Sequence, residues 1–282
     1  MESSNLQGRT FLVTGANSGI GRSLCEALAA GGARVIMAAR SAERTTPVLA
    51  EIRKRFPAAE LSFLPLDLAD FGSVRQAAQQ VLGASRGLDV LVNNAGIAGT
   101  RALSKDGFDL TYATNHLGPF LFTNLLLPRL RQSSDARIVN VASVANKMVK
   151  KIDWSVLDRR SVARQSGFND YAITKLMNVI HAKELTRRLP GSPVAACSLH
   201  PGAVATNIWR ALPGPLAWVM KLFMLSNEQG ALTPLFCATA PRTSLVSGEY
   251  YVRSRVARAN PLADDPALGA ELWARSEAAT SL

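Results

Sequence analysis

The chain alternates short apolar runs with longer segments of helical periodicity. Six apolar runs predict strands at Thr10–Thr14, Val35–Ala39, Leu61–Leu66, Leu88–Asn93, Ile138–Ala142 and Val194–Leu199. Helical patterns lie at Ile20–Ala30, Ala42–Arg55, Ser73–Leu82, Phe108–Leu130 and Tyr171–Leu189. We expect Gly118-Pro119 to perturb the fourth of these helices locally. A short seventh strand near Tyr250–Val252 and a packed C-terminal helix over Pro266–Glu277 complete the pattern.

This alternation predicts right-handed crossovers and a parallel sheet that is covered on both faces. The run Ile138–Val141 is apolar at three of its four positions, which fits a strand buried on both sides. We therefore expect one domain over residues 1–282, with an α/β, Rossmann-like, doubly wound fold. Its sheet would be mainly parallel and seven-stranded, with helices on both faces.

Composition narrows the possible partners. The net charge of +11 favours anionic ligands, but the basic residues are scattered and do not interleave with aromatics, so nucleic acid is not expected. Three cysteines without a CxxC pair indicate reduced thiols in a cytoplasmic protein. The histidines are not spaced as metal ligands, so no metal is expected.

Two features bear on location. The first ten residues have no apolar core of a signal peptide. The longest apolar stretch, Pro215–Leu225, is interrupted by Lys221 and is far shorter than the roughly 20 residues needed to span a bilayer. The sequence thus predicts a cytoplasmic protein.

A glycine-rich loop, TGANSGIG at Thr14–Gly21, joins the first predicted strand to the first predicted helix. Glycines permit a sharp turn and close approach to a pyrophosphate, and the helix N-terminus supplies amide donors. The spacing is neither GxGxxG nor a Walker A loop, and Ser18 does not lie in a GxSxG elbow. We expect phosphate contacts from Gly15, Asn17, Ser18, Gly19, Ile20 and Gly21.

Further motifs follow in order along the chain. These are Asn93-Asn94-Ala95-Gly96, Asn115, Ser143, the YxxxK motif from Tyr171 to Lys175, Pro201-Gly202 and Thr206. With TGxxxGIG, the series resembles the short-chain dehydrogenase/reductase superfamily from about residue 8 to residue 252. The resemblance implies an oxidoreductase with a nicotinamide dinucleotide, which interconverts an alcohol and a carbonyl. It assigns further cofactor contacts to Asp67, Leu68, Asn94, Ala95, Gly96, Tyr171, Lys175, Pro201, Gly202 and Thr206.

The end of the second predicted strand indicates which dinucleotide is bound. NAD enzymes carry an acidic residue there for the ribose diol, whereas this strand ends Ala38-Ala39-Arg40. Arg40 can pair with a 2′-phosphate, and Arg22 could supply a second cation, so we expect NADP(H). The alternative is that Arg40 is a solvated loop residue. Asp67 likewise has an alternative role, as a cap for the helix that begins near Asp70.

The proposed catalytic group is Asn115, Ser143, Tyr171 and Lys175. Tyr171 and Lys175 are four residues apart and so share one helix face. A lysine cation nearby would lower the pKa of the phenol, which could then exchange a proton with the substrate oxygen. Ser143 would orient that oxygen. The resemblance gives Asn115 a supporting place in a water-linked proton path and Lys175 a contact to the nicotinamide ribose. A surface Tyr–Lys pair, a turn serine and a solvated asparagine are the alternatives.

One departure concerns the spacing between Ser143 and Tyr171, which are 28 residues apart, about twice the separation in many family members. The long insert, the NHLGPF run at Asn115–Phe120 and SGEYY at Ser247–Tyr251 resemble the retinol dehydrogenase-like branch. That branch reduces retinal and other apolar aldehydes with NADPH. The N-terminal hydrophobic segment of its membrane-anchored members is not seen in this sequence.

The resemblance places a substrate lid at about 203–228, where Trp209, Trp218, Lys221 and Phe223 occur. We expect the lid to cover a small apolar alcohol or carbonyl, retinoid-like or a lipid aldehyde, and to touch a membrane surface peripherally. The alternative is that these residues pack on the core or on a second subunit of a homo-oligomer. A second hypothesis for the whole chain is a non-catalytic NADP(H)-binding regulatory protein, which keeps the fold without the chemistry.

Overall fold

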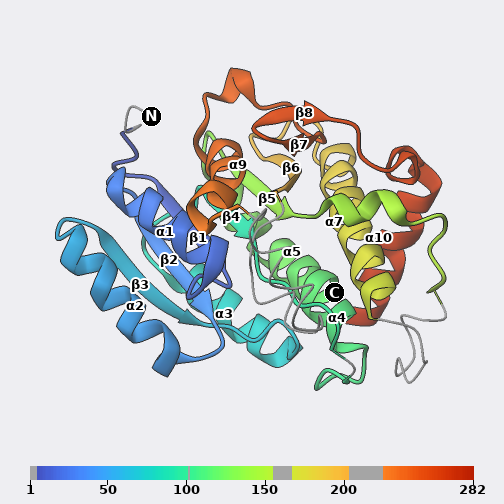
Figure 1. Cartoon of the computed structure of the whole chain (residues 1–282), viewed down its shortest axis with the longest axis horizontal. Coiled ribbons are helices and arrows are strands. Elements are labelled where there is room, and N and C mark those ends of the chain that lie inside the picture. Colours follow the sequence, from blue (N-terminus) through green and yellow to red (C-terminus); the bar gives the residue numbers. More distant parts are fainter. Residues whose placement is uncertain (1–4, 101, 155–166, 203–224) are drawn as a thin grey trace.

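The computed structural model describes residues 5–100, 102–154, 167–202 and 225–282. Within them, the strands form a single sheet in the order β3-β2-β1-β4-β5-β6-β7-β8 (Figure 1). The strands are β1 Thr10–Thr14, β2 Arg34–Ala39, β3 Glu60–Pro65, β4 Val90–Asn93, β5 Arg137–Val141, β6 Ala195–His200, β7 Tyr250–Val252 and β8 Arg255–Ala257. The order reverses direction between β1 and β4, as in doubly wound folds. The α/β, Rossmann-like prediction is therefore confirmed.

The sheet has one more strand than predicted. β7 is parallel to β6, but β8 returns antiparallel to β7, pairing Tyr250 with Ala257. Arg253 and Ser254 connect the two strands with φ angles of 51° and 59°. Two left-handed residues in succession make the tight turn that suits the sheet twist. Asn and Gly usually occupy such positions, so Arg-Ser gave no hairpin signal in the sequence.

Helices cover both faces of the sheet (Figure 1). One face carries α1 Gly19–Ala30, α2 Ala42–Arg55 and α9 Asn227–Thr239, whose apolar side chains join a core with β1 and β2. The other face carries α3 Phe71–Gly83, α5 Gly118–Leu130, α7 Phe168–Arg188 and α10 Pro266–Thr280. The short 3-10 helices are η2 Val144–Met148, η4 Arg242–Ser244 and η5 Pro261–Asp264. None of the described helices is long and apolar enough to cross a membrane.

The helix predicted over Phe108–Leu130 consists of three parts. α4 Leu110–Tyr112 leads into a π-helical turn, η1 Ala113–Leu117, and α5 begins at Gly118. Pro119 lacks the amide that would bond to the carbonyl of Asn115, so the regular ladder is interrupted there. A Cβ on Gly118 would lie 2.2 Å from the carbonyl oxygen of Leu68, which explains the glycine. The perturbation thus lies in the turn before Gly118-Pro119, where Asn115 is located.

The predicted lid at 203–228 falls mostly on residues outside those described. Its described end, residues 225–228, leads into α9, which begins at Asn227. Ser226 caps this helix: its hydroxyl accepts a hydrogen bond from the Gln229 amide, and the Gln229 side chain accepts one from the Ser226 amide. The S-x-x-Q pattern is a known helix-start signal that could have found this helix.

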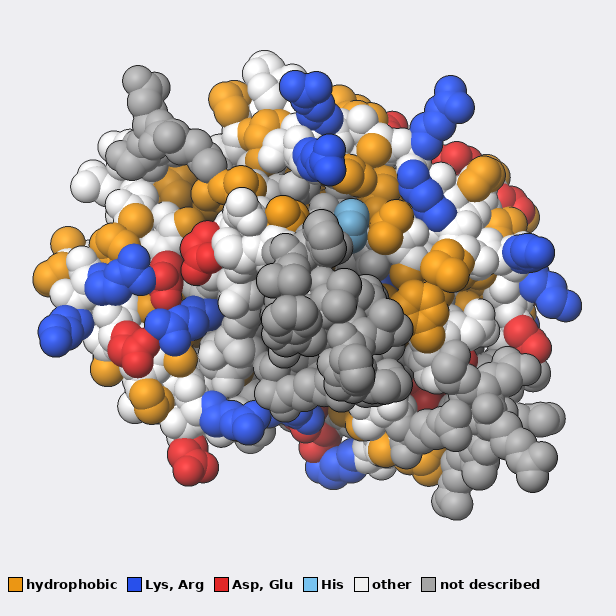
Figure 2. Space-filling model, viewed as in Figure 1, with side chains coloured by type: hydrophobic (Ala, Val, Ile, Leu, Met, Phe, Trp, Pro, Cys, Tyr) orange, Lys and Arg blue, Asp and Glu red, His pale blue; other side chains and the backbone are white. Residues whose placement is uncertain are grey.

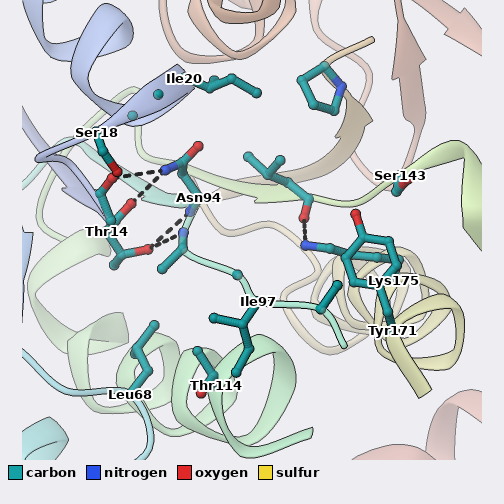
Figure 3. A pocket seen from close by; sticks show the side chains of 18 of the residues that line it. Thr14, Ser18, Ile20, Leu68, Asn94, Ile97, Thr114, Ser143, Tyr171 and Lys175 are labelled. Atoms are coloured by element: carbon teal, nitrogen blue, oxygen red, sulfur yellow. Dashed lines mark hydrogen bonds between the residues drawn. The ribbon is translucent and has the colours of Figure 1, made fainter. Parts of the chain in front are cut away.

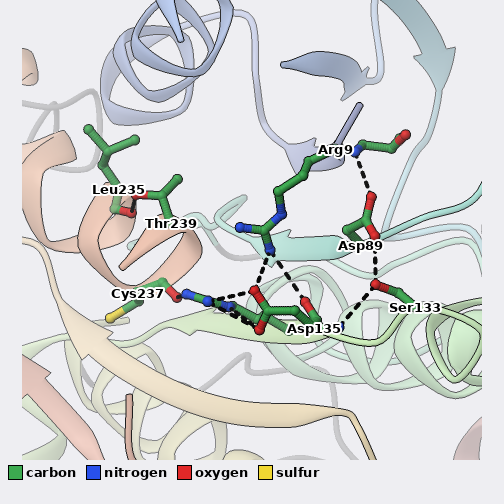
Figure 4. A network of polar contacts seen from close by, with 9 residues as sticks. Arg9, Asp89, Ser133, Asp135, Leu235, Cys237 and Thr239 are labelled. Carbon is green, nitrogen blue, oxygen red and sulfur yellow. Dashed lines mark hydrogen bonds and ion pairs between the residues drawn. The ribbon is translucent and has the colours of Figure 1, made fainter. Parts of the chain in front are cut away.

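A polar network fixes the N-terminal ends of the central strands (Figure 4). Arg137, which is 1% exposed, contacts Asp135 at 2.8 Å, and Arg9 contacts the same carboxylate at 3.0 Å. Asp89 accepts a 2.7 Å hydrogen bond from the amide of Thr10. These contacts tie β1, β4 and β5 together at the edge of the sheet opposite their carboxyl ends.

Candidate active site

A cavity of about 790 Å³ lies at the carboxyl ends of β1, β2, β4, β5 and β6 (Figure 3). This is the edge where ligands bind in open α/β sheets. Seventeen of the predicted site residues line it: Gly15, Asn17, Ser18, Gly19, Ile20, Gly21, Arg40, Asp67, Leu68, Asn94, Ala95, Gly96, Ser143, Tyr171, Lys175, Pro201 and Gly202. Arg22 and Asn115 do not line it, and Thr206 lies outside the described residues.

The glycine loop is joined by hydrogen bonds to the turn that follows β4. The Thr14 hydroxyl accepts hydrogen bonds from the amides of Asn94 and Ala95, each 3.0 Å long. The Asn94 side chain donates a 2.8 Å hydrogen bond to the carbonyl oxygen of Thr14 (Figure 3). Thr14 was not among the predicted site residues, although its hydroxyl at a strand end was a usable signal. These hydrogen bonds hold the glycine loop beside the Asn94–Gly96 turn, the two segments that were predicted to contact the cofactor.

The loop itself fits a bound pyrophosphate. Gly15 and Gly19 have φ angles of 65° and 53°, which L side chains rarely adopt. A Cβ on Gly21 would lie 2.4 Å from the Gly15 carbonyl oxygen, so this position requires glycine. Ser18 precedes α1 in an extended conformation without a side-chain capping bond. The start of α1 therefore presents a hydroxyl and a helix dipole to the cavity.

The basic residues near the loop divide into two groups. Arg22, predicted as a cofactor contact, lies outside the cavity because Glu26 at 2.9 Å and Glu51 at 2.6 Å hold its guanidinium. Arg40 lines the cavity as predicted, and Arg44 lines it as well. Neither of these two forms an ion pair with another described residue. The cavity therefore has Arg44, on the first turn of α2, as its second basic residue beside Arg40, where the sequence analysis had expected Arg22.

Asp67 lies in the cavity wall and does not cap the following helix. Its carboxylate accepts a 3.0 Å hydrogen bond from the amide of Ala69. The cap of α3 is Asp70, which accepts from the amides of Gly72 and Ser73. The alternative reading of Asp67 as the helix cap is therefore wrong.

Three predicted catalytic residues converge at the far end of the cavity. Tyr171 and Lys175 project from α7, and Ser143 follows β5 (Figure 3). The Lys175 ammonium is 5.5 Å from the centroid of the Tyr171 ring and donates a 2.9 Å hydrogen bond to the Val141 carbonyl oxygen. Tyr171 is 6% exposed and Lys175 only 2%. The surface-pair alternative is therefore wrong for this tyrosine and lysine.

Burial dominates the electrostatics of this group. It raises the pKa of Tyr171, and a hydrogen bond from Ser143 opposes that rise. It also lowers the pKa of Lys175 to about 8, because the ammonium has lost most of its water. The expected lowering of the phenol pKa by Lys175 is not seen in this arrangement. The phenol is thus a protonated acid at neutral pH, beside a lysine that titrates near the physiological range.

Asn115 lies in the π-helical turn η1 and is fully buried. Its side chain exchanges two hydrogen bonds with the backbone of Ile97, at 2.8 and 2.9 Å, and donates a third to Thr174 at 3.1 Å. A Cβ on Gly96 would lie 3.2 Å from the Lys175 nitrogen and 3.3 Å from the Asn115 side-chain oxygen. Asn115 therefore anchors the turn after β4 next to Lys175. The solvated-asparagine alternative is wrong.

Sequence reasoning did not identify the apolar part of the cavity wall. The cavity that Ser143 and Tyr171 line is also lined by Ile97, Val144, Met148 and Phe168. Val144 and Met148 are 52% and 65% exposed, which is unusual for large apolar side chains. No motif marks these residues, since only the fold brings them to the entrance.

Comparisons with known proteins identify the family. Residues 9–156 match the family model described as short chain dehydrogenase. The chain is 39% identical over 280 residues to bovine Dehydrogenase/reductase SDR family member 13, covering 96% of this chain and 73% of that protein. It is 37% identical over 298 residues to human Retinol dehydrogenase 14, covering 98% and 88%.

Solved structures agree as well. A Mycobacterium paratuberculosis protein of unassigned function superposes with a TM-score of 0.79 at 36% identity, over 99% of this chain and 95% of that one. The Pseudomonas aeruginosa RhlG/NADP active-site complex gives a TM-score of 0.70 at 26% identity, over 88% and 95%. The fold, the ordered motifs and these relatives agree: the chain belongs to the short-chain dehydrogenase/reductase family of oxidoreductases, in its retinol dehydrogenase-like branch.

Proposed function

We propose that this protein is an NADP(H)-dependent oxidoreductase that interconverts an apolar alcohol and its aldehyde or ketone. The observation that carries the proposal is that Tyr171, Ser143 and Lys175 share one cavity with the glycine loop. A nicotinamide cofactor, when bound, supplies or accepts the hydride. The protein supplies position and the proton.

The raised pKa of Tyr171 keeps its phenol protonated at neutral pH, which suits donation of a proton to a carbonyl oxygen. Ser143 shares a hydrogen bond with this phenol and would polarise the same oxygen. A charged Lys175 would stabilise the phenolate that proton donation leaves behind. These properties favour carbonyl reduction over alcohol oxidation at neutral pH.

The choice of NADP(H) over NAD(H) is supported by the cations at the end of β2. Arg40 and Arg44 line the cavity without a carboxylate partner among the described residues, and Ala39 leaves no acidic group there. Two free guanidinium groups suit a 2′-phosphate, whose oxygens accept charge-assisted hydrogen bonds. RhlG, whose solved complex contains NADP, offers a related precedent.

An apolar substrate is supported by the side chains around the entrance. Val144 and Met148 remain largely exposed there, and Phe168 lies 6.0 Å from Tyr171 between ring centroids. Exposed apolar side chains beside a binding site indicate a ligand that covers them. Retinoids and lipid aldehydes fit this chemistry, and a relative named Retinol dehydrogenase 14 is similar over most of its length.

The test is an NADPH-oxidation screen across retinoid, aliphatic, aromatic and steroid carbonyls, with NADH as the control in the same plate. Turnover of an apolar carbonyl with NADPH but little with NADH is the expected result. Binding of NADPH without turnover of any carbonyl would instead support the alternative, a non-catalytic NADP(H)-binding regulatory protein. Equal rates with both cofactors would contradict the role given to Arg40 and Arg44.

Contact with a membrane surface is the remaining part of the proposal, together with a cytoplasmic location. Lys147, Lys150 and Lys151 are exposed in the same stretch as Met148, so cations and an apolar side chain lie together beside the entrance. On the face shown in Figure 2, Lys and Arg are spread out and form no single stripe that would suit nucleic acid. Sedimentation with anionic liposomes at low salt tests the contact, and an absence of co-sedimentation would reject it. A homo-oligomer stays a prediction that light scattering can test.

A further inference from the structure

Two buried asparagines connect Ser143 to the C-terminal segment of the chain. The Asn146 side chain donates a 2.6 Å hydrogen bond to the Ser143 carbonyl oxygen and accepts a 2.9 Å bond from the Asn260 amide. In return, the Asn260 side chain donates to the carbonyl oxygens of Asn146 at 2.8 Å and Val149 at 2.7 Å. Asn260 thus bonds to the middle and to the C-terminal end of η2, the 3-10 turn that Ser143 begins, and reaches Ser143 through Asn146.

The pair is fully satisfied and shielded from water. Asn146 is 0% exposed and Asn260 is 4% exposed. The Asn260 oxygen also accepts a 3.0 Å hydrogen bond from the Leu262 amide, at the start of η5. A buried network whose members all have partners permits essentially one arrangement, because any rotation leaves an amide without its hydrogen bond. The contacts therefore set the orientation of η2 as well as its stability.

The network extends to the phenol side of the site. Ser143 caps η2 through its hydroxyl, which accepts a 3.3 Å bond from the Ala145 amide. Tyr250, on β7, is 1% exposed; burial raises its pKa, and Asn146 and Tyr171 are both near enough to shift it. Movement of Asn146 would therefore alter the surroundings of Ser143 and of Tyr250, which neighbours Tyr171.

We propose that Asn146 and Asn260 are positioning residues, which hold the Ser143 hydroxyl at the place where it meets the substrate oxygen and the Tyr171 phenol. The inference rests on the proposed function, since positioning is measured through turnover. It gives the segment after β8 a role in the reaction although that segment does not line the cavity. A displaced hydroxyl slows the chemical step but leaves the distant glycine loop and the cofactor contacts intact.

Shape-preserving substitutions test this pair. Asn146→Asp keeps the acceptor for the Asn260 amide and removes the donor to Ser143, while Asn260→Asp removes both donors to η2. Asn124→Asp is the matched control, because the Asn124 amide donates one 2.9 Å bond to the Phe120 carbonyl within α5, away from the cavity. We expect kcat to fall about 10- to 100-fold in the first two variants, with NADPH affinity within about twofold of wild type. The control should keep wild-type kcat.

A double-mutant cycle with Ser143→Ala separates positioning from general damage. If Asn260 acts through Ser143, then Asn260→Asp should have little further effect on kcat in the Ser143→Ala background. An equal loss of kcat in both backgrounds would overturn the inference, as would wild-type kcat in both asparagine variants.

A second measurement does not depend on turnover. Hydrogen–deuterium exchange of peptides covering 143–149 should be faster in Asn146→Asp and Asn260→Asp than in Asn124→Asp, because the η2 amides lose their support. Unchanged exchange would overturn the inference even if no substrate is found. Normal NADPH binding with no wild-type turnover would reject the proposed function alone.

Discussion

The side-chain nitrogen of Lys175 donates a 2.9 Å hydrogen bond to the carbonyl oxygen of Val141, the last residue of β5. This bond places the ammonium between the sheet and the Tyr171 ring, in a site from which water is almost excluded. The lysine therefore titrates near a pKa of about 8, far below its usual range. The charge state of the site changes within a pH range where enzymes are routinely assayed.

The first prediction concerns the pH dependence of reduction. Below pH 8 Lys175 is charged and stabilises the phenolate formed when Tyr171 donates its proton, so kcat/KM for carbonyl reduction should fall as the pH rises through about 8. A pH profile from 6 to 10 at saturating NADPH measures this. In Lys175→Arg the guanidinium stays charged, so the fall near pH 8 should disappear from the profile of any remaining activity. A wild-type profile that is flat across pH 8 would contradict the assignment.

The second prediction concerns the proton donor. Tyr171→Phe removes the hydroxyl but keeps the ring, which packs against Phe168. Turnover should drop by about 10²- to 10⁴-fold, the range typical of general acid catalysis, while NADPH binding measured by fluorescence stays near wild type. Near-wild-type turnover of this variant would show that another group supplies the proton.

The third prediction concerns the glycine loop. Gly21→Ala would place a methyl carbon 2.4 Å from the Gly15 carbonyl oxygen and 2.6 Å from the Asn94 side chain, so the loop must shift. NADPH affinity should fall at least tenfold, or the protein should lose stability. The matched control is Gly83→Ala at the end of α3, where a Cβ meets nothing within 4 Å. This control should bind NADPH normally and be as stable as wild type or slightly more stable, because alanine favours a helix.

The fourth prediction concerns cofactor choice. The double variant Arg40→Ala, Arg44→Ala removes two guanidinium groups from the cavity wall, at the end of β2 and the start of α2. Neither has a carboxylate partner among the described residues. At roughly 1.5–3 kcal/mol for each hydrogen bond to a charged group, KM for NADPH should rise at least tenfold while KM for NADH changes little. Arg22→Ala is the control: its loss breaks surface ion pairs with Glu26 and Glu51 and should leave the ratio of the two KM values unchanged. A larger change in this ratio from Arg22→Ala than from the loss of Arg40 and Arg44 would show that Arg22 contacts the cofactor.

The sequence was sufficient to predict an element wherever a local pattern of residues determines where that element begins and ends. The predicted bounds of β1 at Thr10–Thr14 and of α2 at Ala42–Arg55 match the structure, because apolar runs and capping residues mark both. The loop, the turn at Asn94 and Ser143 lie together because parallel strands end at one edge. The YxxxK motif joins them because it lies near the start of α7. Motifs at strand ends are therefore predictable even when they are far apart in the chain.

The differences from the sequence analysis have physical causes. Arg22 lies outside the cavity because its partner Glu51 is 29 residues away on another helix, where no local pattern shows it. The pKa of Tyr171 was predicted in the wrong direction because burial outweighs a charge whose position relative to the ring is set by the fold. β8 was missed because the turn at Arg253 and Ser254 uses residues that rarely adopt left-handed angles. The first two differences depend on tertiary contacts, whereas β8 was missed because its turn carries no local signal.

The last prediction concerns stability at acidic pH, and it arises from an aromatic cluster between α5, α7 and α10. His116 and His181 are 1% and 3% exposed. Between ring centroids, His181 lies 5.3 Å from Phe120 and 6.0 Å from Trp273, and His116 lies 6.0 Å from Phe120. Burial lowers the pKa of both histidines, that of His181 to about 3. Both are therefore neutral in the folded protein at pH 5.5, whereas in the unfolded chain they bind protons below about pH 6.5.

Because the folded pKa lies below the unfolded one, stability is complete above pH 6.5 and decreases as the pH falls below that value. Between pH 7.5 and 5.5 each histidine should remove about 1.4 kcal/mol from the free energy of unfolding, as measured by urea denaturation. His116→Gln with His181→Gln should lower stability at pH 7.5 but reduce its decrease on acidification. Proton NMR of the wild-type histidines gives an independent check if that variant does not fold. Titration of either ring near pH 6.5 in the folded protein would contradict the prediction, since it would mean that water and charge can enter the cluster.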